Sequence, residues 1–294
     1  MLEIKSINKS FREDFWKPSK KVLSNLNFSI NENEVVGFVG SNGSGKTTTI
    51  KIILGLIKSD SGHVIFSEKL GKNKQEIFQQ IGYLPEIPRF FENLTGNQVV
   101  FYLSNLYGMN KIEINDKLKN MADDLSLEFA LDRKIGTYSK GMKQRIGFII
   151  ATIHSPKLLV LDEPLSGLDP EGRFIFKNKI RELHKNGTSI LMTSHILEDL
   201  YEVGTKFIML KDGSVAKIKT NFELQEQSTY ILKIKKNQLN SQKIDYCQIK
   251  YFDDFDVLTF KFQDRAKILG DLDIKWENVI SYNNELGNIR EFFK

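Results

Sequence analysis

The sequence predicts an α/β fold with a largely parallel sheet, followed by a small α+β appendage. Up to about residue 218, short apolar runs alternate with stretches of helical spacing, as in domains where helices cover a parallel sheet. Beyond about residue 221, apolar and polar residues alternate, which is typical of strands with one buried face. A chain of 294 residues is long enough for both parts.

Four runs in the first part have the composition of strands that are covered on both faces. They are nearly all apolar and span residues 35–39, 158–161, 190–193 and 206–210. Residues 93–152 instead place apolar side chains such as Val99, Val100 and Leu103 at helical spacing, without a convincing strand. We therefore expect a helical insert within a first domain that spans residues 1–218.

The appendage, residues 221–294, begins after a hairpin turn signal at residues 211–214. Two predicted strands each place three apolar residues on one face, namely Tyr230, Leu232 and Ile234, and then Leu258, Phe260 and Phe262. A final helix is predicted from the spacing of Leu286, Ile289 and Phe292. Together these elements predict a small α+β unit.

Composition narrows the functional classes. The net charge of +5 comes from 42 basic and 37 acidic residues spread along the chain, which gives no ground for nucleic-acid binding. Cys247 is the only cysteine, so an intramolecular disulfide and a cysteine metal cluster are excluded, as expected in a reducing compartment. No apolar stretch approaches the ~18 residues that span a bilayer, and the N-terminus lacks a signal pattern. We expect a cytosolic chain that another protein must hold if it acts at a membrane.

A glycine-rich loop, GSNGSGKTT at residues 40–48, follows the predicted strand 35–39. It precedes an amphipathic helix whose apolar residues have helical spacing: Ile50, Ile53, Leu54 and Ile57. This context predicts a phosphate-binding loop formed by Gly40, Ser41, Asn42, Gly43, Ser44, Gly45, Lys46, Thr47 and Thr48. Its N–H groups would point at phosphate oxygens, Lys46 would lie against the β- and γ-phosphates, and Thr47 would offer its hydroxyl to Mg²⁺. The sequence therefore predicts nucleotide binding.

A second predicted strand, residues 158–161, ends in two acids, Asp162 and Glu163, before Pro164 stops the ladder. Ligands of open α/β sheets bind at the carboxyl ends of strands. We assign Asp162 to Mg²⁺ and Glu163 to the general base that polarises the attacking water. Such a pair is often only a solvated turn, and the phosphate-binding loop is what favours the catalytic interpretation.

Three further motifs resemble those of the ATP-binding cassette (ABC) family. YSKGMKQR at residues 138–145 resembles the signature that is usually written LSGGQ. SGLD at residues 166–169 resembles the D-loop, and MTSH at residues 192–195 resembles the segment that carries the switch histidine. The resemblance covers residues 1–218 and implies the P-loop NTPase fold of an ABC ATPase, with ATP and Mg²⁺ as its ligands.

The resemblance also implies roles for individual residues. In this family the signature of one subunit faces the γ-phosphate of ATP held by the other, which assigns contacts in trans to Ser139, Lys140, Gly141 and Met142. His195 would contact the γ-phosphate and hold Glu163 and the water in place, and Asp169 would belong to the D-loop. The active form would be a head-to-tail dimer of two copies, or of this chain with a homologous ATPase subunit.

Two features depart from the family's usual pattern. Glu86 stands in place of the Q-loop glutamine, and its carboxylate can bind Mg²⁺ or accept a hydrogen bond from the water. The signature reads YSKGMKQR instead of LSGGQQR, so that Lys140 stands beside the second glycine position. Together these variants resemble the exporter branch that handles drugs, antibiotics, peptides and lipids.

The family stacks an aromatic ring on adenine, and Phe11 fits this position best. The following stretch, residues 12–21, is longer than usual and contains Phe15 and Trp16, so both remain alternatives. Residues 86–97 correspond to a groove that receives a helix of the membrane subunit, although Phe90 and Phe91 can equally be core residues.

The sequence thus predicts the ATP-hydrolysing subunit of a bacterial exporter for drugs, antimicrobials or peptides. A separate membrane-spanning permease subunit would hold it at the cytoplasmic face of the membrane. A soluble cassette ATPase that acts on ribosomes or DNA is disfavoured, because only one cassette fits and the insert lacks heptads. A regulatory module, in which the appendage senses a ligand while the cassette switches, remains an alternative.

Overall fold

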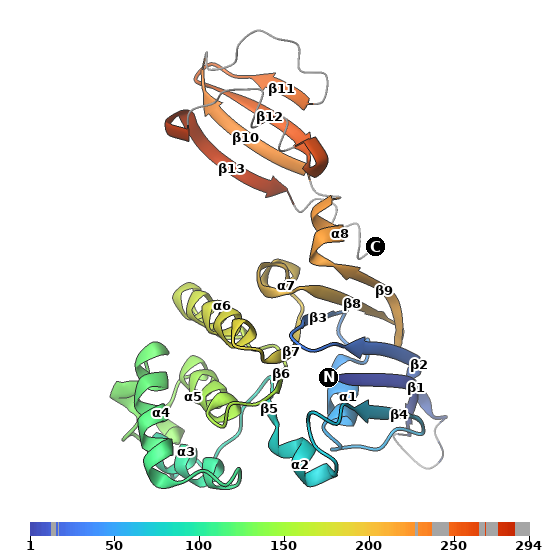
Figure 1. The fold of residues 1–294 in the computed structure, drawn as a ribbon, viewed down its shortest axis with the longest axis vertical. Coiled ribbons are helices and arrows are strands. Elements are labelled where there is room, and N and C mark those ends of the chain that lie inside the picture. Colours follow the sequence, from blue (N-terminus) through green and yellow to red (C-terminus); the bar gives the residue numbers. More distant parts are fainter. Residues whose placement is uncertain are drawn as a thin grey trace. The chain divides into compact units, whose positions relative to one another are not determined.

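The computed structural model describes residues 1–12, 16, 18–226, 229–236, 247–264, 268 and 276–285. The chain divides into two compact units, Met1–Ile218 and Lys219–Lys294. Each unit has a cluster of buried hydrophobic side chains of its own. Figure 1 shows their elements along the chain.

A six-stranded sheet lies at the centre of the first unit. In sheet order its strands are β5 (Ile81–Leu84), β6 (Leu158–Leu161), β7 (Ser189–Ser194), β3 (Val35–Val39), β8 (Lys206–Lys211) and β9 (Ser214–Thr220). The first five run parallel, and β3, β6 and β7 are buried at every position, as expected for strands covered on both faces. All four strands that the apolar runs predict are therefore present.

A second sheet was not predicted from the sequence. It is antiparallel and consists, in sheet order, of β2 (Lys20–Ile30), β1 (Leu2–Phe11) and β4 (Ser61–Phe66). The register of β1 shifts at several points, and Ser6 and Asn25 have positive φ. These irregularities interrupt the alternation of apolar and polar residues by which a strand is recognised.

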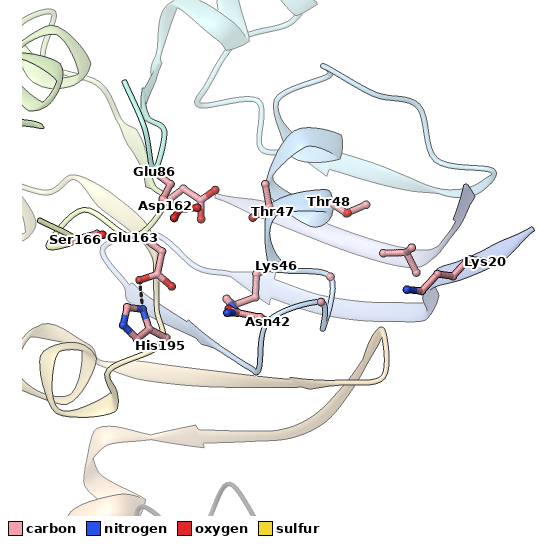
Figure 2. Close-up of a pocket in the computed structure, with 13 residues that line it drawn as sticks. Lys20, Asn42, Lys46, Thr47, Thr48, Glu86, Asp162, Glu163, Ser166 and His195 are labelled. Carbon is pink, nitrogen blue, oxygen red and sulfur yellow. Dashed lines mark hydrogen bonds and ion pairs between the residues drawn. The ribbon is translucent and has the colours of Figure 1, made fainter. Parts of the chain in front are cut away.

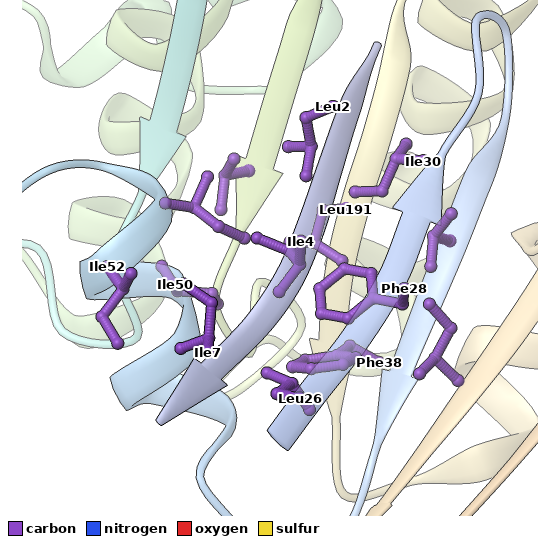
Figure 3. Close-up of a cluster of buried hydrophobic side chains, with 14 of the residues drawn as sticks. Leu2, Ile4, Ile7, Leu26, Phe28, Ile30, Phe38, Ile50, Ile52 and Leu191 are labelled. Carbon is purple, nitrogen blue, oxygen red and sulfur yellow. The ribbon is translucent and has the colours of Figure 1, made fainter. Parts of the chain in front are cut away.

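The core of the first unit contains side chains from both sheets. Figure 3 shows Ile4 of β1, Phe28 of β2 and Phe38 of β3 lying close together. The rings of Phe28 and Phe38 are 5.3 Å apart between centroids. Because Phe38 is completely buried in the strand that leads to the glycine loop, this packing anchors the loop to both sheets.

Helix α1 (Lys46–Ile53) begins in the glycine loop and is shorter than the predicted apolar pattern. Gly55, just after its C-cap Leu54, has φ +67°, a left-handed conformation that commonly ends helices. Ile57 lies beyond the helix but packs against the core. In the first unit, the other described α-helices outside the insert are α2 (Lys74–Gln79), α6 (Pro170–Lys185) and α7 (Leu197–Val203).

Three helices pack against one another where the helical insert is predicted: α3 (Gly96–Asn105), α4 (Lys111–Asp124) and α5 (Lys140–Thr152) (Figure 1). Each begins with a side chain that accepts a backbone N–H, which satisfies a free donor at the helix start. Two short 3₁₀ helices, Glu128–Ala130 and Ile135–Thr137, connect α4 to α5. No helix within the described part of the chain is long and apolar enough to cross a membrane.

The second unit contains α8 (Asn221–Glu226) and an antiparallel sheet of β11 (Cys247–Tyr251), β12 (Phe255–Lys261), β10 (Thr229–Lys235) and β13 (Val279–Glu285). Its buried cluster includes Tyr230, Leu232, Ile234, Leu258 and Phe260, as the alternation predicts. Phe262 lies one residue beyond β12, in the 3₁₀ helix Phe262–Asp264, and is only partly buried. The helix predicted from Leu286, Ile289 and Phe292 lies outside the described residues.

His154 follows α5 and stacks on Tyr107, with ring centroids 3.7 Å apart and an interplanar angle of 13°. Burial lowers the pKa of His154 to about 4, and the charge of Lys117 acts in the same direction. Backbone groups of Ile81 and Ile150 oppose this shift only in part. The imidazole is therefore neutral in the folded chain at neutral pH.

We expect the free energy of unfolding to decrease as the pH falls from about 6.5 to about 4. In this window His154 binds a proton in the unfolded chain but not in the folded chain, so protons favour unfolding. The gap between the two pKa values corresponds to at most about 3 kcal/mol. Urea unfolding of the wild type and of His154→Phe, which keeps a ring against Tyr107, would measure this. An equal loss in both proteins would assign the effect to other groups.

Candidate functional site

The glycine loop connects the end of β3 to the start of α1. Gly43 and Gly45 have φ of +83° and +104°, which side chains disfavour, and a Cβ on Gly45 would lie 2.5 Å from a side chain of β2. Lys46 is buried, and its Nζ donates to the carbonyl oxygens of Gly40 (2.6 Å) and Ser41 (3.2 Å). The loop therefore holds an ammonium group among its own backbone atoms, where a phosphate would meet it.

A pocket of about 410 Å³ opens beside this loop (Figure 2). It lies where parallel strands β3, β5, β6 and β7 end, and such strand ends meet at one edge of a sheet. Ten of the predicted site residues line the pocket: Asn42, Gly43, Gly45, Lys46, Thr47, Thr48, Glu86, Asp162, Glu163 and His195. Residues that are far apart in the sequence thus face one cavity. Ser44, in the same loop, is buried.

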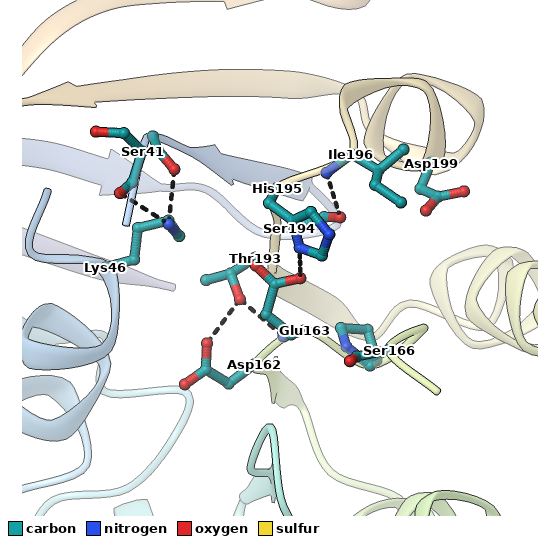
Figure 4. Close-up of polar contacts among 12 residues, drawn as sticks. Ser41, Lys46, Asp162, Glu163, Ser166, Thr193, Ser194, His195, Ile196 and Asp199 are labelled. Carbon is teal, nitrogen blue, oxygen red and sulfur yellow. Dashed lines mark hydrogen bonds and ion pairs between the residues drawn. The ribbon is translucent and has the colours of Figure 1, made fainter. Parts of the chain in front are cut away.

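A chain of hydrogen bonds connects the two acids (Figure 4). The backbone N–H of Glu163 donates to Thr193 Oγ1 (2.8 Å), and the Thr193 hydroxyl donates to Asp162 Oδ1 (2.7 Å). Thr193 is completely buried in β7, so it fixes both acids without help from solvent. Thr193 is not among the site residues predicted from the sequence. Its signal was a hydroxyl within an otherwise apolar run.

Glu163 has φ +49°, a left-handed backbone conformation that is uncommon for a residue other than glycine. Its Oε2 lies 2.8 Å from Nδ1 of His195 (Figure 4). The Glu163 side chain is 12% exposed and that of His195 is 59% exposed. A shielded carboxylate beside an open pocket, oriented by an imidazole, is suited to accept a proton from water.

The carboxyl group of Asp162 lies deeper in the site. Burial raises the pKa of Asp162, and the nearby charge of Glu86 acts in the same direction. The Thr193 hydroxyl opposes this shift, as do the Thr47 hydroxyl and the charge of Lys46. The Glu86 carboxylate thus favours the protonated form of Asp162, whereas the two hydroxyl groups and the Lys46 ammonium favour its ionised form.

This donor set fits Mg²⁺ that arrives with a nucleotide. Within the described residues, no group of three His, Cys, Asp or Glu side chains could hold a metal ion without other ligands. Thr47, Asp162 and Glu86 line the same pocket. Mg²⁺ commonly binds through one or two carboxylates together with phosphate oxygens and water, which is what these residues can provide.

The predicted signature residues and Asp169 of the predicted D-loop are not part of the described lining of this pocket. Ser139, Lys140, Gly141, Met142 and Asp169 are absent from its described lining. Ser139 caps α5 by accepting the N–H of Met142 (3.2 Å), and Asp169 caps α6 by accepting the N–H of Gly172 (3.2 Å). Their roles therefore remain predictions that one chain alone cannot satisfy.

Phe11 also lies outside the described lining of the pocket. It is the last residue of β1, is 41% exposed and has the Nζ of Lys9 5.2 Å from its ring centroid. Phe11 is the strand partner of Lys20, and Lys20 does line the pocket. Phe11 therefore lies near the pocket without being part of its described lining, and adenine stacking on Phe11 stays a prediction. Of the alternatives, Trp16 is 85% exposed and Phe15 lies outside the described residues.

Three lining residues were missed in the sequence, namely Lys20, Val22 and Ser166. Lys20 and Val22 belong to β2, a strand that was not predicted from the sequence. Ser166 is in the predicted D-loop, and its N–H donates to the carbonyl oxygen of Glu163 (3.0 Å). The motif included Ser166, but only the fold shows that it borders the cavity.

A phosphate-binding loop and paired acids at the carboxyl ends of parallel strands define a P-loop nucleoside triphosphatase. Residues 23–166 match the protein-family model described as ABC transporter. The chain belongs to the ATP-binding proteins of the ABC transporter family; it binds ATP and is an ATPase. The predicted family and enzyme class are thereby confirmed.

Known proteins support this assignment. The chain is 38% identical over 216 residues to the uncharacterized ABC transporter ATP-binding protein YxlF of Bacillus subtilis (strain 168), which covers 74% of this chain and 70% of that protein. It is 37% identical over 199 residues to the bacitracin transport ATP-binding protein BcrA of Bacillus licheniformis, covering 67% and 64%. A solved structure of an ATP binding subunit of an ABC transporter superposes with TM-score 0.68 at 29% identity, covering 77% of this chain and 92% of that one. The predicted fold class is confirmed.

Thr193→Val should reduce the ATPase rate by about tenfold or more. The change keeps the volume but leaves the buried Asp162 carboxylate and the Glu163 N–H without their shared partner, a loss of about 1–3 kcal/mol for each unpaired group. Thr193→Ser keeps the hydroxyl and should remain close to wild type. Steady-state phosphate release, with circular dichroism to verify folding, would measure both. If the Thr193→Val and Thr193→Ser proteins hydrolyse ATP at the same rate, the Thr193 hydroxyl has no role in the site.

Proposed function

We propose that this chain is the motor subunit of a membrane exporter and works as a head-to-tail dimer beside a separate membrane-spanning subunit. The observation that carries the proposal is the composition of the pocket. It is lined by residues of the phosphate-binding loop, both acids and His195, whereas Ser139 and Lys140 are exposed at the start of α5 and are not part of its described lining. A second ATPase subunit would supply the Ser139 hydroxyl and the backbone N–H groups of this helix start to the nucleotide.

Hydrolysis would use the residues that face the cavity. The N–H groups of the glycine loop and Lys46 bind the phosphates, and Glu163 accepts a proton from the attacking water. His195, 2.8 Å from Glu163, orients the carboxylate and contacts the γ-phosphate. Thr47 and Asp162, with Glu86 beside them, would hold Mg²⁺, which when bound offsets charge on the β- and γ-phosphates.

The dimer explains how ATP performs mechanical work. The start of α5 from a second subunit would present the Ser139 hydroxyl and backbone N–H groups to the γ-phosphate. ATP then binds the closed dimer more tightly than the open one, and hydrolysis removes that difference. A shift from 1:99 to 99:1 requires about 5.5 kcal/mol, which two shared triphosphates with several charged hydrogen bonds can supply.

Export is supported by the relationship to BcrA, whose name assigns it to bacitracin transport, and by the Glu86 and signature variants. A surface for the membrane subunit lies near the predicted groove at residues 86–97. A hollow of about 450 Å³ there is lined by Phe91, Glu92, Asn93, Leu94 and Tyr102. Phe91 is 65% exposed, so it is not a core residue, and Phe90 is partly buried. An exposed aromatic in a hollow suits an apolar helix of a partner.

Glu163→Gln should bind ATP and accumulate as a dimer, because the closed state forms but the water is no longer activated. Size-exclusion chromatography with light scattering, with ATP and with ADP, would measure the mass. Lys46→Ala, which loses its phosphate contacts, should stay monomeric in ATP. A Glu163→Gln protein that hydrolyses ATP at the wild-type rate would exclude Glu163 as the base.

Affinity purification of the tagged chain from detergent-solubilised host membranes should recover a multi-spanning protein in stoichiometric amount. Phe91→Asp should lose this partner, because a carboxylate would enter the apolar hollow. Phe129→Asp is the matched control, since Phe129 is 68% exposed outside the hollow and its change should retain the partner. If the chain is recovered only from the soluble fraction, with ribosomal or DNA-bound partners, the role in a transporter is wrong. The assignment as an ATPase would be unaffected.

A further inference from the structure

The first turn of α5 packs directly against the loop that follows Glu163. A Cβ on Gly167 would lie 2.5 Å from Cδ of Lys140, so the lysine stem covers this part of the loop. The buried Gln144 donates through Nε2 to the carbonyl oxygen of Pro164 (3.1 Å). The start of α5 and the D-loop are thus one packed unit within the chain.

Two hydrogen bonds connect Lys140 to the proposed base. The Nζ of Lys140 donates to Ser166 Oγ (3.1 Å), and the N–H of Ser166 donates to the carbonyl oxygen of Glu163 (3.0 Å). Ser166 and Glu163 both border the pocket (Figure 2), but Lys140 is not part of its described lining. The lysine therefore reaches the site in its own chain indirectly, through Ser166.

This contact depends on the departure from the family's usual signature. A glycine at position 140, as in LSGGQ, would have no side chain to cover Gly167 or to donate to Ser166. The resemblance assigned Lys140 to the nucleotide of the other subunit, but its ammonium is bound within its own chain. In the proposed dimer, the start of α5 would face the ATP that is bound by the partner. Lys140, in this helix start, is hydrogen-bonded to the loop that borders the ATP of its own chain.

We infer that Lys140 is a positioning residue that couples the two ATP sites. The inference rests on the proposed dimer. Movement of the α5 start toward the partner's nucleotide is transmitted by Lys140 to Ser166, and from Ser166 to the backbone of Glu163. Binding of ATP at one site therefore changes the alignment of the base at the other, and in a dimer of two identical copies the effect runs in both directions by symmetry.

The test is the dependence of the ATPase rate on ATP concentration. The Hill coefficient of the wild type should lie between about 1 and about 2, the limit for two sites. Lys140→Met keeps an apolar stem over Gly167 but removes the donor, so the Hill coefficient should fall to about 1. Lys140→Arg, which retains a donor, should restore it. Ser166→Ala should behave like Lys140→Met, and the double variant should be no worse than either single variant.

Lys143→Met is the matched control. Lys143 lies on the same helix, but its Nζ pairs with Glu92 (3.4 Å) instead of the D-loop, so its loss should leave the Hill coefficient unchanged. ADP binding should equal that of the wild type in the variants that change only Lys140 or Lys143, because neither lysine is part of the described lining of the pocket.

Two outcomes would overturn the inference. One is a wild-type Hill coefficient of about 1, and the other is an unchanged coefficient in Lys140→Met. The ATP-dependent dimer of Glu163→Gln is measured separately. If that dimer forms and Lys140→Met still shows normal cooperativity, the coupling role fails while the proposed motor remains. If no dimer forms, the proposed function itself fails.

Discussion

The hydroxyl of Thr193 is the contact on which the arrangement of the two acids depends. Parallel pairing of β6 with β7 places Leu161 opposite Met192, so the residues that follow, Asp162 and Thr193, are neighbours at the sheet edge. There Thr193 donates to the carboxylate and accepts the N–H of Glu163. A buried carboxylate without a partner would be costly. The register of β6 against β7 therefore decides whether Asp162 and Glu163 can share the Thr193 hydroxyl.

Much of this site could be predicted because its signals are local. The glycine loop, the acids after an apolar strand and the histidine after another each occupy a few consecutive residues. The carboxyl ends of parallel strands always meet at one edge, so the convergence of Lys46, Asp162 and His195 follows once the strands are recognised. Apolar composition was sufficient to recognise them, since these strands are buried on both faces.

The remainder depends on contacts that a linear pattern does not contain. The antiparallel sheet was missed because register shifts in β1 disturb its alternation, and Lys20 and Val22 were missed with it. Lys140 was recognised as part of a motif, yet its bond to Ser166 exists only because α5 packs on the D-loop. The contacts that we propose between two subunits cannot be described from one chain. These residues reach the site through strand pairing and helix packing, which residue type alone does not predict.

The separate cores of the two units have an evolutionary consequence. The first unit ends within β9, and the second has its own cluster around Leu232 and Leu258. The two clusters have no residue in common, so a substitution inside the appendage cluster leaves the residues of the first cluster unchanged. The two parts can accumulate mutations under different selection, so the ATPase can remain constant while the appendage is adapted, exchanged or lost among descendants of a common cassette.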